Sequence, residues 1–274
     1  MNSTLPAIAA VVCYLVSAVV IALRLFHGGS DRRIPRHAGI VLGLAGVILH
    51  GLFLYQQVVT DNGINLGFFD AASVISWTIL LILLISAISK PVENLGIALL
   101  PLAALAILLQ LKFPSSLLLA PGAPWGLRIH VLISLLAYSL FSMASVQAIL
   151  LAIQDHHLRH RHPGGFIRSL PPLQTMEELL FEMIGAGFVL LTLALVTGFM
   201  FLQDMFAQHL AHKTILSIIA WLVFGALLWG RFRFGWRGQK ALIWTLVGFV
   251  VLMLAYFGSK FVIEVVLKGG GTVG

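Results

Sequence analysis

Long apolar segments recur along the 274-residue chain and limit the folds that it can adopt. The clearest runs from Ile215 to Trp229, with Lys213 before it and Arg231 and Arg233 after it. About 20 apolar residues cross the roughly 30 Å hydrocarbon core of a bilayer as an α-helix. Backbone groups in lipid have no water to bond, so each such segment has to satisfy them internally as a helix. The chain is therefore expected to be an integral membrane protein.

Apolar segments of this length can be drawn eight times. They lie at about residues 5–26, 37–59, 68–89, 92–111, 129–153, 183–203, 213–231 and 241–262. The stretches between them are rich in Gly, Pro and charge, as in HGGSDRRIPRH, and no strand pattern is present. We predict an all-α polytopic membrane protein, in which residues 1–274 form a single transmembrane domain. It is a bundle of eight transmembrane helices with short loops and interfacial helices.

Polar residues at segment ends give finer expectations. Thr175 and Glu178, in QTMEELLFEM, fit a capping box and predict a short interfacial helix before the sixth segment. Glu93 and Gln110 lie at the two ends of the fourth segment, where we expect their side chains to reach the interface.

Composition excludes several functional classes. Hydrophobic residues make up 59% of the chain and charged residues 10%, with a mean hydropathy of +1.01. The formal net charge of +7 could attract nucleic acid, but basic residues in a membrane chain usually set its orientation. We therefore expect no nucleic-acid partner. The single cysteine, Cys13, excludes an intrachain disulfide and a cysteine-based metal site.

The basic residues are distributed unevenly between the two sides that eight spans define. Twelve of the 17 fall on one side: Arg24, Arg32, Arg33, Arg36, Lys90, Arg159, Arg161, Arg168, Arg231, Arg233, Arg237 and Lys240. The basic side of a membrane protein faces the cytoplasm. This asymmetry predicts a multi-pass protein of the bacterial inner membrane with both termini on the periplasmic side.

One histidine, His50, lies inside a predicted span, in GVILHGLFLYQQ. It lies about 20 Å from the cytoplasmic start of its helix at 1.5 Å per residue. A polar side chain at this depth is costly and indicates either a function or a contact between helices. A neutral imidazole here could ligate a haem iron or hydrogen-bond a neighbouring helix.

Three further histidines lie toward the predicted outer face. His130 opens the fifth segment, where an interfacial histidine could simply face water. His209 and His212 precede the seventh segment at a spacing that places both on one helical face. The sequence contains no phosphate-binding loop, no nucleophile elbow, no His-Glu-x-x-His and no paired carboxylates at catalytic spacing. We therefore expect no enzyme activity.

Several motifs follow one another in a fixed order. Lys213, Trp221 and Arg231 precede the G-W-x-G run of Gly235–Gly238, and IHVLISLLAYSLF and LPPLQTMEELLFEMIGAGFVLLTLALVTG lie upstream. In order and spacing these stretches resemble the cytochrome c assembly family, polytopic proteins that handle haem for c-type cytochrome maturation. The resemblance covers about residues 60–260.

The resemblance implies haem as cofactor and histidines as iron ligands. His130 matches the family's external histidine, and His50 its intramembrane histidine by position in the second helix. His209 or His212 would be a further external ligand. Where the family has its tryptophan-rich haem motif, this chain has FLQDMFAQHLAHK. That departure is similar to the HemX-like branch of the family.

Three functional hypotheses follow. The first is an accessory haem-handling or haem-binding protein related to c-type cytochrome biogenesis, with the lipid bilayer and haem as partners and no catalysis of its own. The second is a haem-free scaffold or regulatory subunit that stabilises or modulates another membrane protein. The third is a small-molecule or ion transporter, for which the sequence offers no inverted repeat and no intramembrane carboxylate pair.

Overall fold

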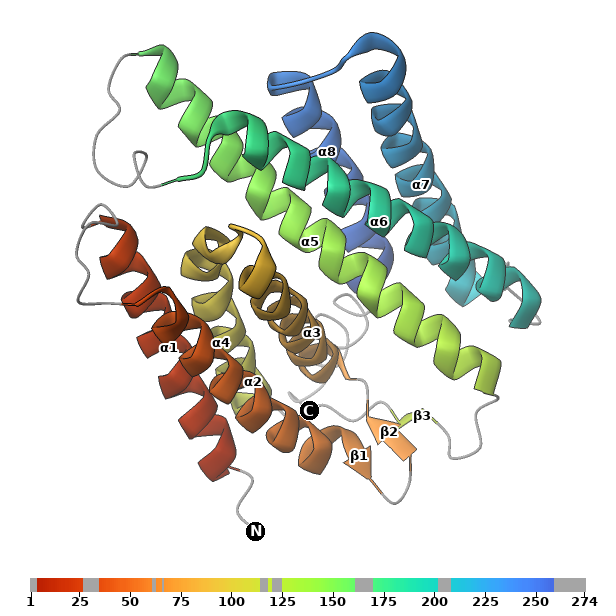
Figure 1. Ribbon diagram of the computed structural model, residues 1–274. Helices are drawn as coiled ribbons and strands as arrows, with labels where there is room; N and C mark the ends of the chain where they lie inside the picture. Colours follow the sequence, from red (N-terminus) through yellow and green to blue (C-terminus); the bar gives the residue numbers. More distant parts are fainter. Residues whose placement is uncertain are drawn as a thin grey trace, which may run out of the picture. The chain divides into compact units, whose positions relative to one another are not determined.

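The computed structural model describes residues 4–26, 35–60, 63–65, 67–113, 118–119, 125–160, 170–201 and 208–258. In this part of the chain, eight helices are long and apolar enough to cross a membrane (Figure 1). The eight α-helices are α1 (Thr4–Phe26), α2 (Arg36–Val58), α3 (Phe68–Ser89), α4 (Gly96–Lys112), α5 (Trp125–Arg159), α6 (Leu173–Phe201), α7 (Gln208–Phe234) and α8 (Gln239–Met253). The fourth and eighth candidate spans, Glu93–Lys112 and Gln239–Gly258, each include a further helical turn. A 3-10 turn, η1 (Glu93–Leu95), precedes α4, and a π-helical turn, η3 (Leu254–Gly258), follows α8. The predicted all-α polytopic fold is confirmed.

The predicted boundaries hold best for the first three helices, which match to within one residue. The fifth and sixth helices are longer than predicted. Because α6 already begins at Leu173, directly after Pro171 and Pro172, Thr175 lies inside its first turn. The predicted capping box of Thr175 and Glu178 is therefore wrong. The expected interfacial helix is the first part of α6 itself, continuous with the span.

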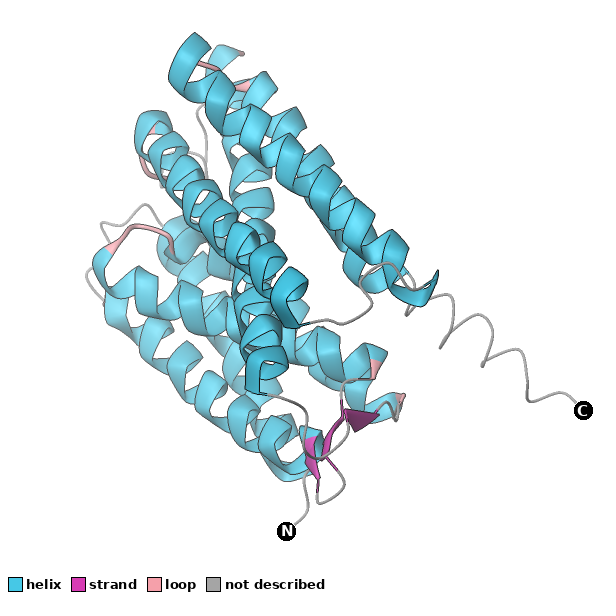
Figure 2. Cartoon of the chain, turned by 90° about the vertical axis from the view of Figure 1, so that its right-hand side faces the viewer, coloured by secondary structure: helices cyan, strands magenta, loops and turns pink. Residues whose placement is uncertain are grey.

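Three short strands add an element for which the sequence gives no pattern. They are β1 (Val59–Thr60), β2 (Gly63–Asn65) and β3 (Leu118–Leu119), drawn in magenta in Figure 2. They pair antiparallel in the order β1-β2-β3. Strands of two or three residues are too short for the period-2 alternation that identifies a strand in sequence.

The chain divides into two compact units. Unit 1 comprises residues 1–122 and 153–175 and contains α1 to α4. Unit 2 comprises residues 123–152 and 176–274 and contains most of α5 and α6 together with α7 and α8. The single domain over 1–274 stays a prediction.

Close packing in unit 1 depends on three glycines of α2. A Cβ added to Gly39, Gly43 or Gly46 would lie within 3 Å of a side-chain carbon on a neighbouring helix. The nearest carbons belong to Ile21 for Gly39, Leu84 for Gly43 and Tyr14 for Gly46. Small residues at such spacing let membrane helices approach closely, because van der Waals packing replaces the hydrophobic effect in lipid.

The carboxylate of Glu93 joins the ends of several helices in unit 1. Arg24, in the last turn of α1, donates to Oε1 at 2.8 Å, and Arg36, at the start of α2, donates to Oε2 at 2.8 Å. Arg36 also donates to the carbonyls of Ala87 and Lys90 at the end of α3, both at 3.0 Å. Glu93 therefore has protein partners at the helix ends, and its expected position at the interface stays a prediction.

Gln110 likewise turns inward. It is 5% exposed, and its Nε2 donates to Oδ1 of the buried Asp70 at 2.7 Å. Both side chains find a protein partner because an unpaired polar group at this depth costs several kcal/mol. Gln110 therefore bonds to a neighbouring helix, and its predicted interfacial position stays a prediction.

Unit 2 has an aromatic interior. Phe141 of α5 stacks on Phe224 of α7, with ring centroids 3.8 Å apart. Phe188 of α6 stacks on Trp221 of α7 at 5.5 Å, and the indole Nε1 of Trp221 donates to Thr192 at 2.8 Å. These contacts place the predicted family tryptophan, Trp221, against α6.

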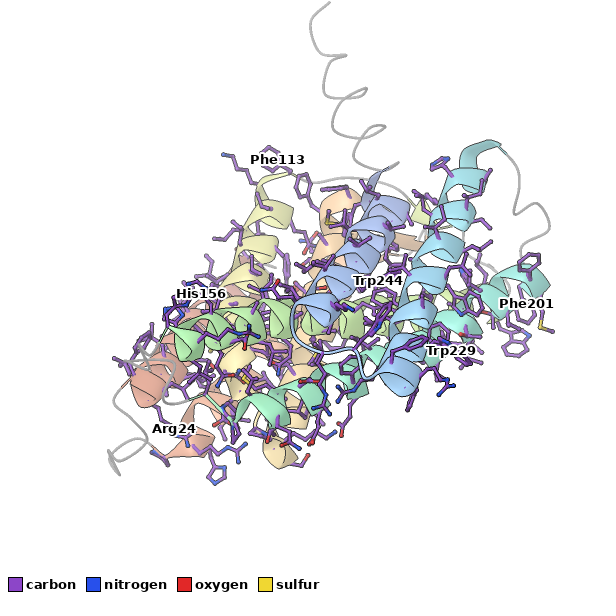
Figure 3. All side chains as sticks on the ribbon, turned by 90° about the horizontal axis from the view of Figure 1, so that it is seen from above. Arg24, Phe113, His156, Phe201, Trp229 and Trp244 are labelled. Carbon is purple, nitrogen blue, oxygen red and sulfur yellow. The ribbon has the colours of Figure 1, made fainter. Side chains whose placement is uncertain are left out.

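The G-W-x-G run forms the turn between α7 and α8. Gly235 and Gly238 have positive φ angles of 64° and 55°, which residues with a Cβ rarely adopt. The Trp236 ring lies against Gly230, where an added Cβ would come within 2.4 Å of ring carbons. Trp236 also contacts Trp244 of α8 at 5.3 Å between centroids; Figure 3 labels Trp244 on α8 and Trp229 on α7.

Arg231 links this turn to the start of α6 by hydrogen bonds and an ion pair. Its guanidinium donates to the Glu177 carboxylate and to the Trp236 carbonyl, and lies 4.5 Å from the ring centroid of Phe181. Arg237 adds a second cation 3.5 Å from Glu177. The family motif in this region therefore has a structural role.

We predict that Gly46→Ala lowers the free energy of unfolding by about 1–3 kcal/mol, because its Cβ would press on the Tyr14 ring. Gly185→Ala in α6 is the matched control, since nothing lies within 4 Å of the added Cβ. The measurement is the thermal unfolding midpoint of each purified variant in detergent. Equal midpoints for the two variants would contradict close packing of α2.

Candidate functional site

His50 is fully enclosed in unit 1, with 0% of its surface exposed. Its Nδ1 lies 3.1 Å from the hydroxyl of Tyr14 on α1, and its Nε2 lies 2.9 Å from the hydroxyl of Ser73 on α3. A neutral imidazole offers one donor and one acceptor, and a hydroxyl can serve as either. Both ring nitrogens are therefore satisfied, and His50 joins three helices.

The surroundings of His50 leave its nitrogens closed to a ligand in this arrangement. The Tyr14 and Phe53 rings, both with 0% exposure, lie 5.8 and 6.4 Å from the imidazole centroid. To bind haem iron, His50 would need a free lone pair on its imidazole. Freeing one would require the loss of a hydroxyl hydrogen bond and the displacement of these rings. The geometry fits the hydrogen-bond alternative and does not fit a haem. Ligation by His50 stays a prediction.

His130 differs from His50 in how its nitrogens are used. It is half-buried in the second turn of α5, and its Nδ1 lies 3.0 Å from the carbonyl of Ala194 and 3.2 Å from the hydroxyl of Thr197, both on α6. A carbonyl only accepts, so Nδ1 carries the proton and Nε2 carries the lone pair. Among the described residues, none hydrogen-bonds Nε2.

This arrangement suits a metal ligand. Histidines that bind metals usually donate the other ring N–H to a carbonyl, a carboxylate or water, which fixes the tautomer and ring orientation. The Ala194 carbonyl does this for His130. His130 therefore has the arrangement expected of a residue that would hold haem iron through Nε2.

Aromatic side chains hold the first turn of α5 against the last turn of α6. The rings of Trp125 and Phe201 have centroids 6.0 Å apart, and Phe201 is labelled in Figure 3. A Cβ on Gly126 would lie 2.5 Å from the Phe201 ring. Because the two helices approach this closely, the acceptors on α6 come within reach of His130.

The structure gives less information on the other two histidines predicted as ligands, His209 and His212. His209 lies in α7, but its side chain is outside the described residues. His212 is exposed in the same helix. The described residues contain no group of three or more His, Cys, Asp or Glu side chains that could hold a metal ion. His50 belongs to unit 1, and the three other histidines belong to unit 2.

The sequence reasoning missed the partners of both histidines. Tyr14, Ser73 and Thr197 are polar residues within apolar spans, which is the signal that could have identified them. Thr197 lies in the quoted stretch ending LLTLALVTG, yet its partner could not be named without the helix packing. Glu177 was missed because its neighbour Glu178 fitted a capping box.

Comparison with known proteins decides the family. The family model described as "Cytochrome C assembly protein" matches residues 38–267. The chain belongs to the cytochrome c assembly family. This confirms the resemblance noted in the sequence.

Relatives of this family member include two kinds of protein. "Inner membrane protein YpjD" of Escherichia coli (strain K12) is 32% identical over 267 residues, which cover 95% of this chain and 98% of the relative. "Cytochrome c biogenesis protein CcsA" of Porphyra purpurea is 27% identical and covers 65% of this chain and 66% of the relative. CcsA of Chlamydomonas reinhardtii is 25% identical, covering 84% and 67%. No solved structure matches the chain.

We predict that His50→Ala lowers the thermal unfolding midpoint of this family member, because the buried hydroxyls of Tyr14 and Ser73 lose a partner at a cost of about 1–3 kcal/mol. His50→Gln, which can bond both hydroxyls, should restore much of that loss. Absorption spectra of protein purified from haem-replete cells provide the second measurement. A Soret band that disappears in both variants would instead establish His50 as an iron ligand.

Proposed function

We propose that the protein is an accessory haem-binding protein of the bacterial inner membrane with a role in c-type cytochrome biogenesis, and that His130 is its iron ligand. The observation that carries the proposal is the hydrogen bond from Nδ1 of His130 to the Ala194 carbonyl, which leaves the Nε2 lone pair for iron. Membership of the cytochrome c assembly family supports it. Similarity to the cytochrome c biogenesis protein CcsA supports the biogenesis role, and similarity to the inner membrane protein YpjD supports the membrane location.

In this proposal, the chain binds haem and does not react with it. Haem would supply an iron centre that accepts a lone pair from the protein. His130 provides that lone pair, and α6 orients the imidazole through Ala194 and Thr197. The sequence replaces the family's tryptophan-rich motif with FLQDMFAQHLAHK, which favours an accessory role over attachment of haem to an apocytochrome.

A haem-free scaffold is the second candidate, and the enclosure of His50 favours it. The residue for which the family position implies a ligand is bonded on both sides by hydroxyls. A family member with this interior could keep its fold without haem and stabilise or modulate another membrane protein. The two candidates differ in one property, the presence of a bound chromophore.

The absorption spectrum separates them. We expect protein purified from haem-replete cells to show a Soret band, and His130→Ala to weaken haem binding about 10-fold or more, since the iron loses its ligand. His156→Ala is the control, because His156 is an exposed histidine of the same helix, α5, that is not a candidate ligand. Wild-type protein that is colourless and takes up no added haem would exclude the haem-binding function and leave the scaffold.

We also propose that both termini face the periplasm, on the basis of the twelve Lys and Arg residues on the opposite side. In a Cys13→Ala background, cysteines at Ser3 and Thr272 should react with a membrane-impermeant maleimide in intact cells. A cysteine at Gly164 should react only after the cells are permeabilised. The reverse labelling pattern would contradict this orientation.

A further inference from the structure

Two threonines of α6 make the same pair of contacts with different partners. The Thr192 hydroxyl donates to the Phe188 carbonyl of its own helix at 2.8 Å and accepts from Nε1 of Trp221 at 2.8 Å. The Thr197 hydroxyl donates to the Leu193 carbonyl at 2.8 Å and lies 3.2 Å from Nδ1 of His130. It also lies 3.1 Å from the Ala194 carbonyl, the second acceptor of His130. Each threonine therefore links α6 to a ring nitrogen on another helix.

The helix carbonyl determines how each hydroxyl can act. A hydroxyl has a single proton, and here that proton bonds to a carbonyl one turn earlier. The oxygen is then left only with lone pairs and can accept but not donate. The indole nitrogen of Trp221 always carries its proton and can only donate, so its contact with Thr192 does not select between protonation forms of the ring. The imidazole of His130 has two tautomers, and an accepting oxygen at Nδ1 stabilises only the one with a proton on Nδ1.

We propose that Thr197 is a positioning residue that, together with the Ala194 carbonyl, holds His130 as the Nδ1–H tautomer with Nε2 available to iron. The use of Nε2 by iron rests on the proposed haem-binding function; the selection of the tautomer does not. Two acceptors lie 3.0 and 3.2 Å from Nδ1. Together they restrain the orientation of the imidazole ring more than a single acceptor would. An arrangement of this kind around a metal-binding histidine typically affects metal affinity 10–100-fold.

A purely structural role for Thr197 is the competing explanation. In that case the hydroxyl only satisfies its own polarity against the helix, and its loss would affect stability without changing the state of His130. Thr192 provides the matched control, because it has the same side chain, lies on the same helix and bonds a ring nitrogen that cannot change tautomer.

The experiment compares Thr197→Val, Thr197→Ser and Thr192→Val. Valine has the shape of threonine without the hydroxyl, and serine retains the hydroxyl. The first measurement is solid-state NMR of haem-free protein in liposomes with ¹⁵N-labelled histidine, with His130 assigned by comparison with His130→Ala. We expect protonated Nδ1 in wild type, Thr197→Ser and Thr192→Val. In Thr197→Val, where the Ala194 carbonyl is the one remaining acceptor, we expect a smaller share of the Nδ1–H tautomer.

The second measurement is haem titration of the same four proteins. We expect Thr197→Val to weaken haem binding roughly tenfold and to shift the Soret maximum, while the other two variants bind as wild type does. Circular dichroism and gel filtration identify any variant that fails to fold, and Thr197→Ala then replaces Thr197→Val.

The outcomes separate the two proposals. A His130 tautomer that is the same in Thr197→Val as in wild type would overturn the positioning role, whatever the haem result. Equal changes in Thr197→Val and Thr192→Val would also overturn it, because they would reflect a general disturbance of α6. A changed tautomer in a protein that binds no haem would support the positioning role and exclude the proposed function.

Discussion

The carboxylate of Glu93 is the contact on which the arrangement of unit 1 depends. It accepts from Arg24 at the end of α1 and from Arg36 at the start of α2, and Arg36 also covers the last carbonyls of α3. Removing one partner of such a group leaves a poorly solvated charge, so the helix ends are fixed together. Unit 2 repeats the principle at Glu177, which binds Arg231 in the last turn of α7.

Once the helix ends are fixed, the polar groups inside the units determine what each unit can do. His50 and His130 are the same residue type within spans, yet one uses both ring nitrogens and the other uses one. In unit 1 the imidazole joins α1, α2 and α3 and contributes stability. In unit 2 the imidazole uses one ring nitrogen, and the other has no hydrogen-bond partner among the described residues. Hydrogen-bond partners, and not burial depth, separate a structural histidine from a candidate ligand.

The sequence was a good guide to the fold because apolar segment length is a direct signal of a membrane helix. It located α1, α2 and α3 to within one residue, and its family resemblance was correct. It was a weaker guide to the site, because pairings such as His50 with Tyr14 join residues 36 positions apart. The partners of Glu93 and Gln110 were missed for the same reason, and the strands were too short for a pattern.

The spacing of Thr192 and Thr197 has a consequence for how α6 can vary in length. Successive residues of an α-helix differ in direction by about 100°, so five positions turn the second hydroxyl well away from the first. One threonine consequently faces Trp221 on α7 while the other faces His130 on α5. Inserting or deleting a single residue between them, of any type, would rotate one of the two threonines away from its partner. The number of residues between the two threonines is therefore fixed by contacts on two different helices at once.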